Sequence, residues 1–164
     1  KIYGDVDPTL RYTIEAAGTS LGLVAGDSFK GSVLRVAGEN VGGYAINQGT
    51  VANSNYDITW AANNLSVTAR PITLTSTAAT KIYGDVDPTL GYTIEAAGTS
   101  RGLVAGDSFT GIVRRVAGEN VGSYAINQGT VANRHYELTW AADNLSVTAA
   151  PIPCTPPAAT NIYR

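Results

Sequence analysis

Hydrophobic and polar residues alternate along several short stretches of the chain, and a period of two is the pattern of a β-strand with one buried face. The clearest stretch is 10–15, where Leu10, Tyr12 and Ile14 alternate with polar residues. Similar stretches occupy residues 28–36, 41–48, 56–60, 65–68 and 71–75. No stretch has a sustained helical period, and the one candidate for a helical turn, near 23–28, is kept short by Gly and Asp. The pattern predicts a mainly β protein with little helix.

Turn-forming residues separate these stretches. Gly4–Pro8 predicts a turn before the first strand, because Gly tolerates positive φ and Pro restricts its own φ. Residues 37–40 predict a hairpin between 28–36 and 41–48. A second hairpin is predicted between 56–60 and 65–68. Six short strands with turns about every ten residues favour a β-grasp-like sheet or a small sandwich.

The chain repeats itself with a period of 80 residues. Residues 1–80 align with 81–160 without a gap, and 64 of the 80 positions are identical. Because the last four residues resemble the start of the repeat and the chain has no Met, we expect a longer parent protein. The predicted organisation is two tandem small β domains in an elongated arrangement. Its segments are repeat 1 at 1–70, a linker strand at 71–80 that belongs to either repeat, repeat 2 at 81–150, and 151–164 as a linker and the start of a third repeat.

Comparison of the two copies predicts which positions are buried. Both copies must bury equivalent positions, so we expect the differences to cluster on the surface. Three differing pairs, Leu21/Arg101, Leu34/Arg114 and Arg11/Gly91, are predicted to face solvent or a neighbouring repeat. The predicted core consists of unchanged apolar and aromatic positions: Tyr12, Ile14, Phe29, Val33, Tyr44, Ile46, Tyr56, Trp60, Leu65 and Val67.

The segment between the repeats, 71–80, is predicted to be a strand, but the sequence does not identify the strand with which it pairs. It contains Pro and Thr but no Gly/Ser tract, which predicts a stiff, extended connection. If 71–80 is the first strand of the second repeat, the first repeat lacks its own starting strand. Its open edge could then pair with Ile152–Thr160 of another molecule, although we expect the fragment to be monomeric.

Composition and charge exclude several classes of partner. Charged residues are 15% of the chain, the formal net charge is −2, and Lys and Arg do not cluster. A nucleic-acid surface needs a concentrated basic face, so we expect no nucleic-acid partner. No apolar stretch reaches 18 residues, and we expect no membrane contact within this fragment. The abundance of Gly, Thr, Ala, Asn and Ser is typical of secreted β-proteins.

Residues that could take part in catalysis or bind a metal are few, and the histidine and the cysteine each lack a counterpart in the other copy. His135 aligns with Asn55, so a His-based triad or metal site would exist once, and Cys154 aligns with Leu74 and has no partner for a disulfide. No nucleophile or acid–base pair is evident, so we predict no enzyme, no catalytic residue and no cofactor. Six aspartates are predicted to cap turns, with a weak Ca²⁺ site as the alternative: Asp5, Asp7, Asp27, Asp85, Asp87 and Asp107.

Three further motifs have an ordinary explanation. Asn64-Leu65-Ser66 and Asn144-Leu145-Ser146 match the glycosylation sequon, and we expect both to be unmodified. The glycines of 38–43 lack a following helix or Lys and favour hairpin geometry over a phosphate loop. The aromatic set of each copy is predicted to be core, with a carbohydrate platform as the alternative: Tyr3, Tyr12, Tyr44, Tyr56 and Trp60 in the first copy.

Three ordered blocks of each copy carry a resemblance to a known family. Residues 1–10, 25–31 and 38–46, and their equivalents in the second copy, resemble the MBG domain of YGX type. Such domains occur in tandem in very large secreted or outer-surface bacterial proteins, many similar to filamentous haemagglutinins, and are mainly β. The resemblance implies a secreted or cell-surface location and a stiff stalk or spacer that projects a distal binding domain of an adhesin. The alternative is a direct adhesive module that binds host protein or glycan. Neighbouring repeats are the expected partners, and the family offers no catalytic residues to transfer.

Overall fold

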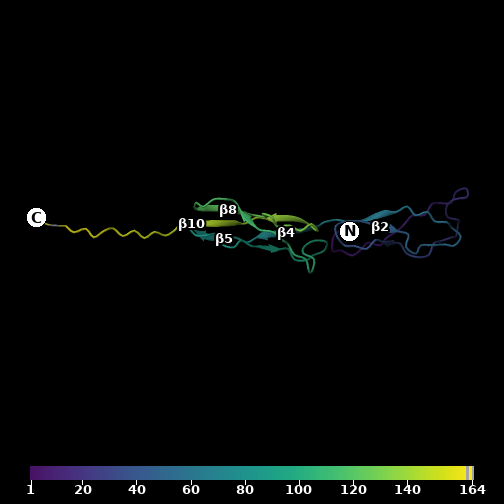
Figure 1. The fold of residues 1–164 in the computed structure, drawn as a ribbon, viewed down its shortest axis with the longest axis horizontal. Coiled ribbons are helices and arrows are strands. Elements are labelled where there is room, and N and C mark those ends of the chain that lie inside the picture. Colours follow the sequence, from purple (N-terminus) through teal and green to yellow (C-terminus); the bar gives the residue numbers. More distant parts are fainter. Residues whose placement is uncertain (162, 164) are drawn as a thin grey trace. The chain divides into compact units, whose positions relative to one another are not determined.

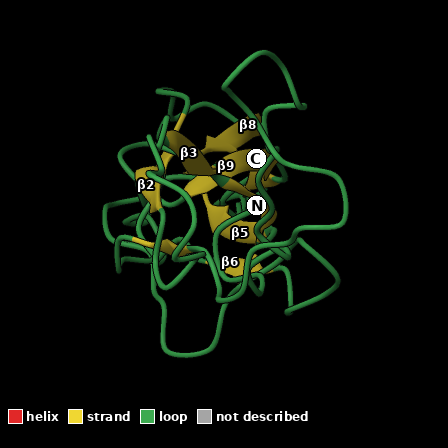
Figure 2. Ribbon diagram, turned by 90° about the vertical axis from the view of Figure 1, so that its right-hand side faces the viewer, coloured by secondary structure: helices red, strands yellow, loops and turns green. Residues whose placement is uncertain are grey.

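The computed structural model describes residues 1–161 and 163, and these residues form strands, turns and loops without a helix (Figure 2). This confirms the mainly β prediction. No helix long and apolar enough to cross a membrane occurs in the described part of the chain. The strands are β1 Leu34–Arg35, β2 Gly42–Asn47, β3 Asn63–Val67, β4 Arg70–Ser76, β5 Ala79–Ile82, β6 Tyr92–Ile94, β7 Arg114–Arg115, β8 Gly122–Asn127, β9 Tyr136–Ala141 and β10 Asn144–Thr148.

The chain forms two compact units whose boundaries differ from those of the sequence repeats. The first unit contains Lys1–Thr73, Ile94–Thr110 and Ala132–Thr139. The second contains Leu74–Thr93, Gly111–Val131 and Trp140–Arg164. Parts of the second sequence repeat therefore fold with the first repeat in one unit.

In the first unit, a three-stranded sheet has the order β1-β2-β3, and both pairs are antiparallel. This confirms the hairpin predicted between 28–36 and 41–48, although its first strand is only two residues long. The turn requires glycine at position 38, whose φ is +145° and whose added Cβ would lie 2.2 Å from the Tyr44 ring. Leu65 and Val67 of β3 are buried, as is Val51.

In the second unit, the sheet has the order β5-β10-β8-β7, and Figure 1 shows its three longer strands side by side. Strand β10 lies between parallel β5 and antiparallel β8. Its alternate residues Leu145 and Val147 are buried, as are Ile126 and Val131. The first unit contains an equivalent of the parallel pairing, because Ile2 forms a parallel bridge with Thr68.

The third sheet has the order β6-β4-β9. Strand β4 confirms the strand predicted at 71–75, and its alternate residues Arg70, Ile72, Leu74 and Ser76 are buried. The second predicted hairpin is wrong. In the second repeat, β9 lies in a sheet with β4, whereas β10 lies in the sheet of β5 and β8. In the first repeat, 10–15 and 56–60 form no strand, whereas their equivalents form β6 and β9.

The predicted core is only partly confirmed. Leu65 and Val67 are buried, but Ile14 is 42% exposed and the other predicted core residues are half-buried. Leu21 and Leu34 are exposed, as predicted. The expectation that differences between the copies lie on the surface fails for β4, because the buried residues Arg70, Leu74 and Ser76 correspond to Ala150, Cys154 and Pro156. Surface exposure therefore does not explain all the differences between the copies.

Candidate functional site at the repeat junction

The start of the first sequence repeat packs against loops of the second repeat within the first unit. The Tyr-Gly-Asp motif at residues 3–5 meets segments 98–107 and 134–136 there. Gly4 lies in the left-handed region with φ +80°, and a Cβ added to it would lie 2.5 Å from a Val104 methyl carbon. Glycine is therefore required both by the backbone conformation and by the close approach of Val104. We name this contact the repeat junction.

Arg70, the first residue of β4, lies at the centre of the repeat junction and is 5% exposed. All five guanidinium N–H donors are used, because Nε makes one hydrogen bond and each terminal nitrogen makes two. The acceptors are the carbonyl oxygens of Gly98 at 2.7 Å, Arg101 at 2.8 Å, Gly102 at 2.9 Å and Tyr3 at 3.1 Å, and the Asp5 carboxylate at 2.8 Å. One side chain thus holds backbone from both sequence repeats.

Asp5 completes this arrangement through a second partner. Its other carboxylate oxygen accepts a hydrogen bond from the Ser100 hydroxyl at 2.6 Å. The bonds from Ser100 and then from Arg70 lower the pKa of the Asp5 carboxyl below its ordinary value. Ser100 has a φ of 56°, a left-handed conformation that is uncommon for a non-glycine residue. Its equivalent Ser20 has a φ of 58°, so this conformation belongs to a turn that both repeats contain.

Tyr3 forms the aromatic part of the repeat junction. Its ring stacks on His135 with centroids 4.6 Å apart and meets Tyr136 edge-on at 5.7 Å. The hydroxyls of Tyr3 and Tyr136 both donate to Asp107, at 3.3 and 2.6 Å. Burial, with the hydrogen bond to Asp107, raises the pKa of Tyr136 to about 12. His135 therefore packs on Tyr3, a contact that the residues around it in the sequence did not predict. The one feature of the sequence that set this position apart is that His135 aligns with Asn55 in the first repeat.

The aspartates predicted to cap turns have other partners. Asp5 and Asp107 bind the junction side chains, Asp27 accepts from the Tyr56 hydroxyl at 2.6 Å, and Asp7 and Asp87 pair with Lys and Arg. The capping prediction is therefore wrong for these five carboxylates. No group of three His, Cys, Asp or Glu residues that could hold a metal ion occurs in the part of the chain that the structure describes.

A network of two cations and two anions recurs in both repeats. In the first, Lys1 and Arg35 each contact both Asp7 and Glu39. Their equivalents in the second are Lys81, Arg115, Asp87 and Glu119. Both Lys side chains are 4% exposed. The hydrogen bond from the arginine has the largest effect on the neighbouring aspartate, and the bond from the lysine has the next largest. Together they lower the pKa of Asp7 to about 2, and the equivalent bonds lower the pKa of Asp87 to about 2.

This network predicts a loss of stability in acid. A carboxylate whose pKa is lower in the folded state stabilises the fold above its ordinary value of about 3.9, and this stability is lost as the pH falls toward 2. We expect the Tm of the chain to fall between about pH 4 and pH 2. An Asp7→Asn/Asp87→Asn chain should start with a lower Tm at pH 5 and show a smaller fall in this range. Calorimetry across this range checks this, with the exposed Asp57→Asn as control.

The aromatic side chains considered as a carbohydrate platform are half-buried in the first repeat. Trp60 donates its indole N–H to the Ile46 carbonyl oxygen at 3.0 Å, and the Tyr12 ring lies 5.9 Å from it. Asn64 and Asn144 of the two sequons are exposed and lie in β3 and β10. Glycan binding and glycosylation at these asparagines stay predictions.

Comparison with known proteins points to one family. The model of a family described as MBG domain (YGX type) matches residues 1–66 and again residues 72–146. These two matches cover most of the chain; the first lies within the first repeat, and the second begins in the segment 71–80 and continues into the second repeat. No curated protein and no solved structure matches the chain.

Proposed function

The chain belongs to the MBG domain family of YGX type, and on that premise we propose that it is a stiff stalk or spacer of a bacterial adhesin. The family is a structural repeat module that occurs generally in large extracellular or surface proteins, and it is not known for enzymatic activity. In this proposal, the parent protein is secreted or attached to the bacterial surface. Successive repeats hold a distal binding domain away from the cell.

The observation that carries this proposal is the fully bonded Arg70 side chain in the repeat junction. A spacer needs successive repeats that do not move freely against each other. Arg70, Asp5 and Ser100 form a buried or half-buried hydrogen-bonded cluster, and Tyr3 adds stacked aromatic contact. Charged hydrogen bonds in a partly buried site are stronger than exposed ion pairs, which contribute little. The cluster thus supports a stiff connection between repeats.

Spin-label distance measurements test the proposal. Labels on Leu34→Cys and Glu137→Cys, two exposed positions of the first unit that belong to different repeats, would be placed in a Cys154→Ser chain. We expect a single narrow distance distribution, because the repeat junction lies in the same unit and joins the two repeats there. Arg70→Ala should broaden this distribution, and the milder Ser100→Ala should broaden it less.

Lys30→Ala, an exposed position outside the junction, is the matched control and should leave the distribution unchanged. Circular dichroism on each variant distinguishes a loosened junction from an unfolded unit. A broad distribution in the unsubstituted chain would refute the stiff spacer, as would an Arg70→Ala chain that is folded and as narrowly distributed as the parent.

A further inference from the structure

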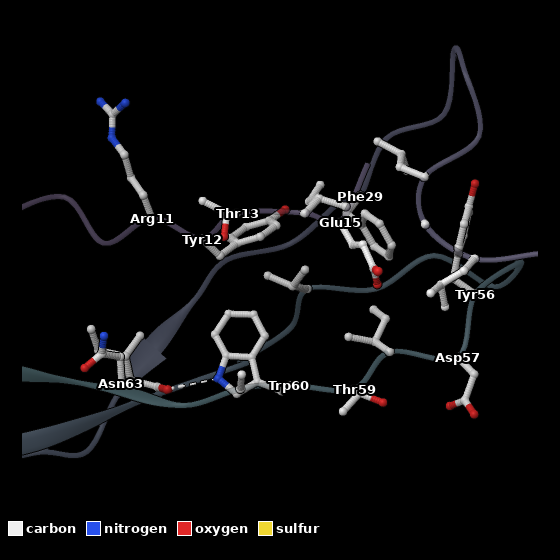
Figure 3. A pocket seen from close by; sticks show the side chains of 18 residues that line it. Arg11, Tyr12, Thr13, Glu15, Phe29, Tyr56, Asp57, Thr59, Trp60 and Asn63 are labelled. Atoms are coloured by element: carbon white, nitrogen blue, oxygen red, sulfur yellow. Dashed lines mark hydrogen bonds between the residues drawn. The ribbon is translucent and has the colours of Figure 1, made fainter. Parts of the chain in front are cut away.

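The first repeat contains an open groove of about 870 Å³ that is lined by two segments, 11–15 and 56–61, and by the loops beside them, with both apolar and polar side chains. Figure 3 shows Tyr12 and Trp60 on facing stretches of the backbone, with Phe29 and Tyr56 further along the groove. Leu23, Ile46 and Val51 also line the groove. The whole groove lies within the first unit.

The equivalent place in the second repeat is occupied by β4. This strand lies between β6 and β9, which are the equivalents of the two segments that line the groove. Strand β4 is held by backbone hydrogen bonds, from Glu95 to the Thr73 carbonyl at 3.0 Å and from Gly102 to the Pro71 carbonyl at 3.0 Å. Two of its side chains, Ile72 and Leu74, are at most 1% exposed.

The aromatic pairs of the two places have nearly the same geometry, although only one place is filled. The Tyr12–Trp60 rings lie 5.9 Å apart and the Tyr92–Trp140 rings 5.8 Å apart. Both indole N–H groups donate over 3.0 Å to the equivalent isoleucine carbonyl. The groove of the first repeat therefore keeps the aromatic pair and the indole hydrogen bond that lie beside β4 in the second repeat.

The empty groove leaves apolar side chains and backbone exposed that a strand would cover. Ile126 is 0% exposed, whereas its equivalent Ile46 is only half-buried. Segments 12–14 and 56–60 have the sequence pattern of strands, yet they form none in the described part of the chain. Unpaired strand edges beside apolar surface are sites of β-strand addition.

We propose that this groove binds a β-strand with the sequence pattern of Arg70–Ser76, supplied by another repeat of the same kind. The pattern places isoleucine and leucine at alternate positions toward the groove and an arginine at the start. Three of the five acceptors used by Arg70 are the carbonyls of Gly98, Arg101 and Gly102 in the second repeat. The equivalent residues in the first repeat are Gly18, Leu21 and Gly22. The Glu95 carboxylate also accepts a hydrogen bond from the Thr73 backbone N–H at 2.8 Å, and Glu15 is the equivalent of Glu95 in the first repeat.

The tail of a second copy is a less suitable occupant. Its Ile152 and Cys154 align with Ile72 and Leu74, and Ile152 is 78% exposed. However, Thr73 and Thr77 each donate a backbone N–H, to Glu95 and to the Gly91 carbonyl. Pro153 and Pro157 stand at these two positions and have no N–H to donate. The tail also has Ala150 in place of Arg70.

The test adds a copy of residues 69–80 directly before Lys1 of the full chain, which reproduces the spacing found ahead of Lys81. We expect hydrogen exchange at residues 12–15 and 56–61 to slow at least about 10-fold, toward the rates of 92–95 and 136–141. We also expect the Tm of the unfolding transition that includes these segments to rise by about 5 °C or more. The matched control carries Ile72→Ser and Leu74→Ser in the added copy only, and should produce neither change.

Three results would overturn the proposal. The first is that the extended chain and its control have the same hydrogen-exchange rates and the same Tm. The second is an unextended chain in which 12–15 and 56–61 are already as protected as 92–95 and 136–141 at low concentration. The third is protection that appears only as the concentration of the unextended chain rises, together with a dimer mass, because the tail of a second copy would then fill the groove. None of these results depends on whether the chain acts as a spacer, which the spin-label distances test separately.

Discussion

Replacing Arg70 with alanine should lower the free energy of unfolding of the first unit by about 3 kcal/mol. The substitution removes five hydrogen bonds from a side chain that is 5% exposed. Four carbonyl oxygens then lose a donor, and the Asp5 carboxylate loses its cationic partner. Removal of one member of a buried charged network costs more than the network itself contributes, because the remaining groups stay desolvated.

Urea unfolding followed by tryptophan fluorescence and by calorimetry measures this loss. Arg70→Lys is the informative second variant. A lysine keeps the charge but has a single ammonium group with three donors, so it cannot reach five acceptors arranged around a planar fork. We expect Arg70→Lys to recover less than half of the lost stability. A loss below about 1 kcal/mol for Arg70→Ala, the level of an exposed ion pair, would show that the junction contributes little to stability.

Leu74→Ala should destabilise the second unit by about 3 kcal/mol. Leu74 is 0% exposed and lies in the middle of β4, so the change removes buried methyl groups and leaves a cavity. The chain offers a matched control at the aligned position of the second repeat. Cys154 is exposed, and Cys154→Ala should change the free energy of unfolding by no more than about 0.5 kcal/mol.

The difference in the free energy of unfolding between Leu74→Ala and Cys154→Ala measures how much stability this position contributes when its segment lies in a sheet. Chemical denaturation of both variants, with unfolding monitored at several wavelengths, gives this difference. Equal small effects would mean that β4 is only loosely packed. Equal large effects would mean that residues near Cys154 are packed in solution.

Sequence and structure agree where the information is local. The hairpin of β1 and β2 follows from the turn residues 37–40 and from alternation on both sides of them, and β4 follows from alternation over 71–75. The glycine at position 38 is visible in the sequence because a tight turn leaves few other residues possible. Leu65 and Val67 were found by their spacing of two.

The sequence failed where pairing is long-range. Alternation predicted that 56–60 forms a strand, but it did not identify the partner, and the predicted hairpin with 65–68 does not form. The same sequence pattern forms β9 in the second repeat and no strand in the first. A strand needs a neighbour for its backbone groups, and the neighbour here is the segment before the repeat.

The sequence by itself determined the period of 80 residues, the β class, the family and the position of the principal turns, because each depends on residues that are close together or on direct identity between copies. Only the tertiary structure decided that Arg70, Asp5 and Ser100 meet, that His135 stacks on Tyr3, and that one of two equivalent grooves is filled. These contacts join residues far apart in the chain. Their formation depends on which strand lies beside which, and the period of alternation carries no information about that choice.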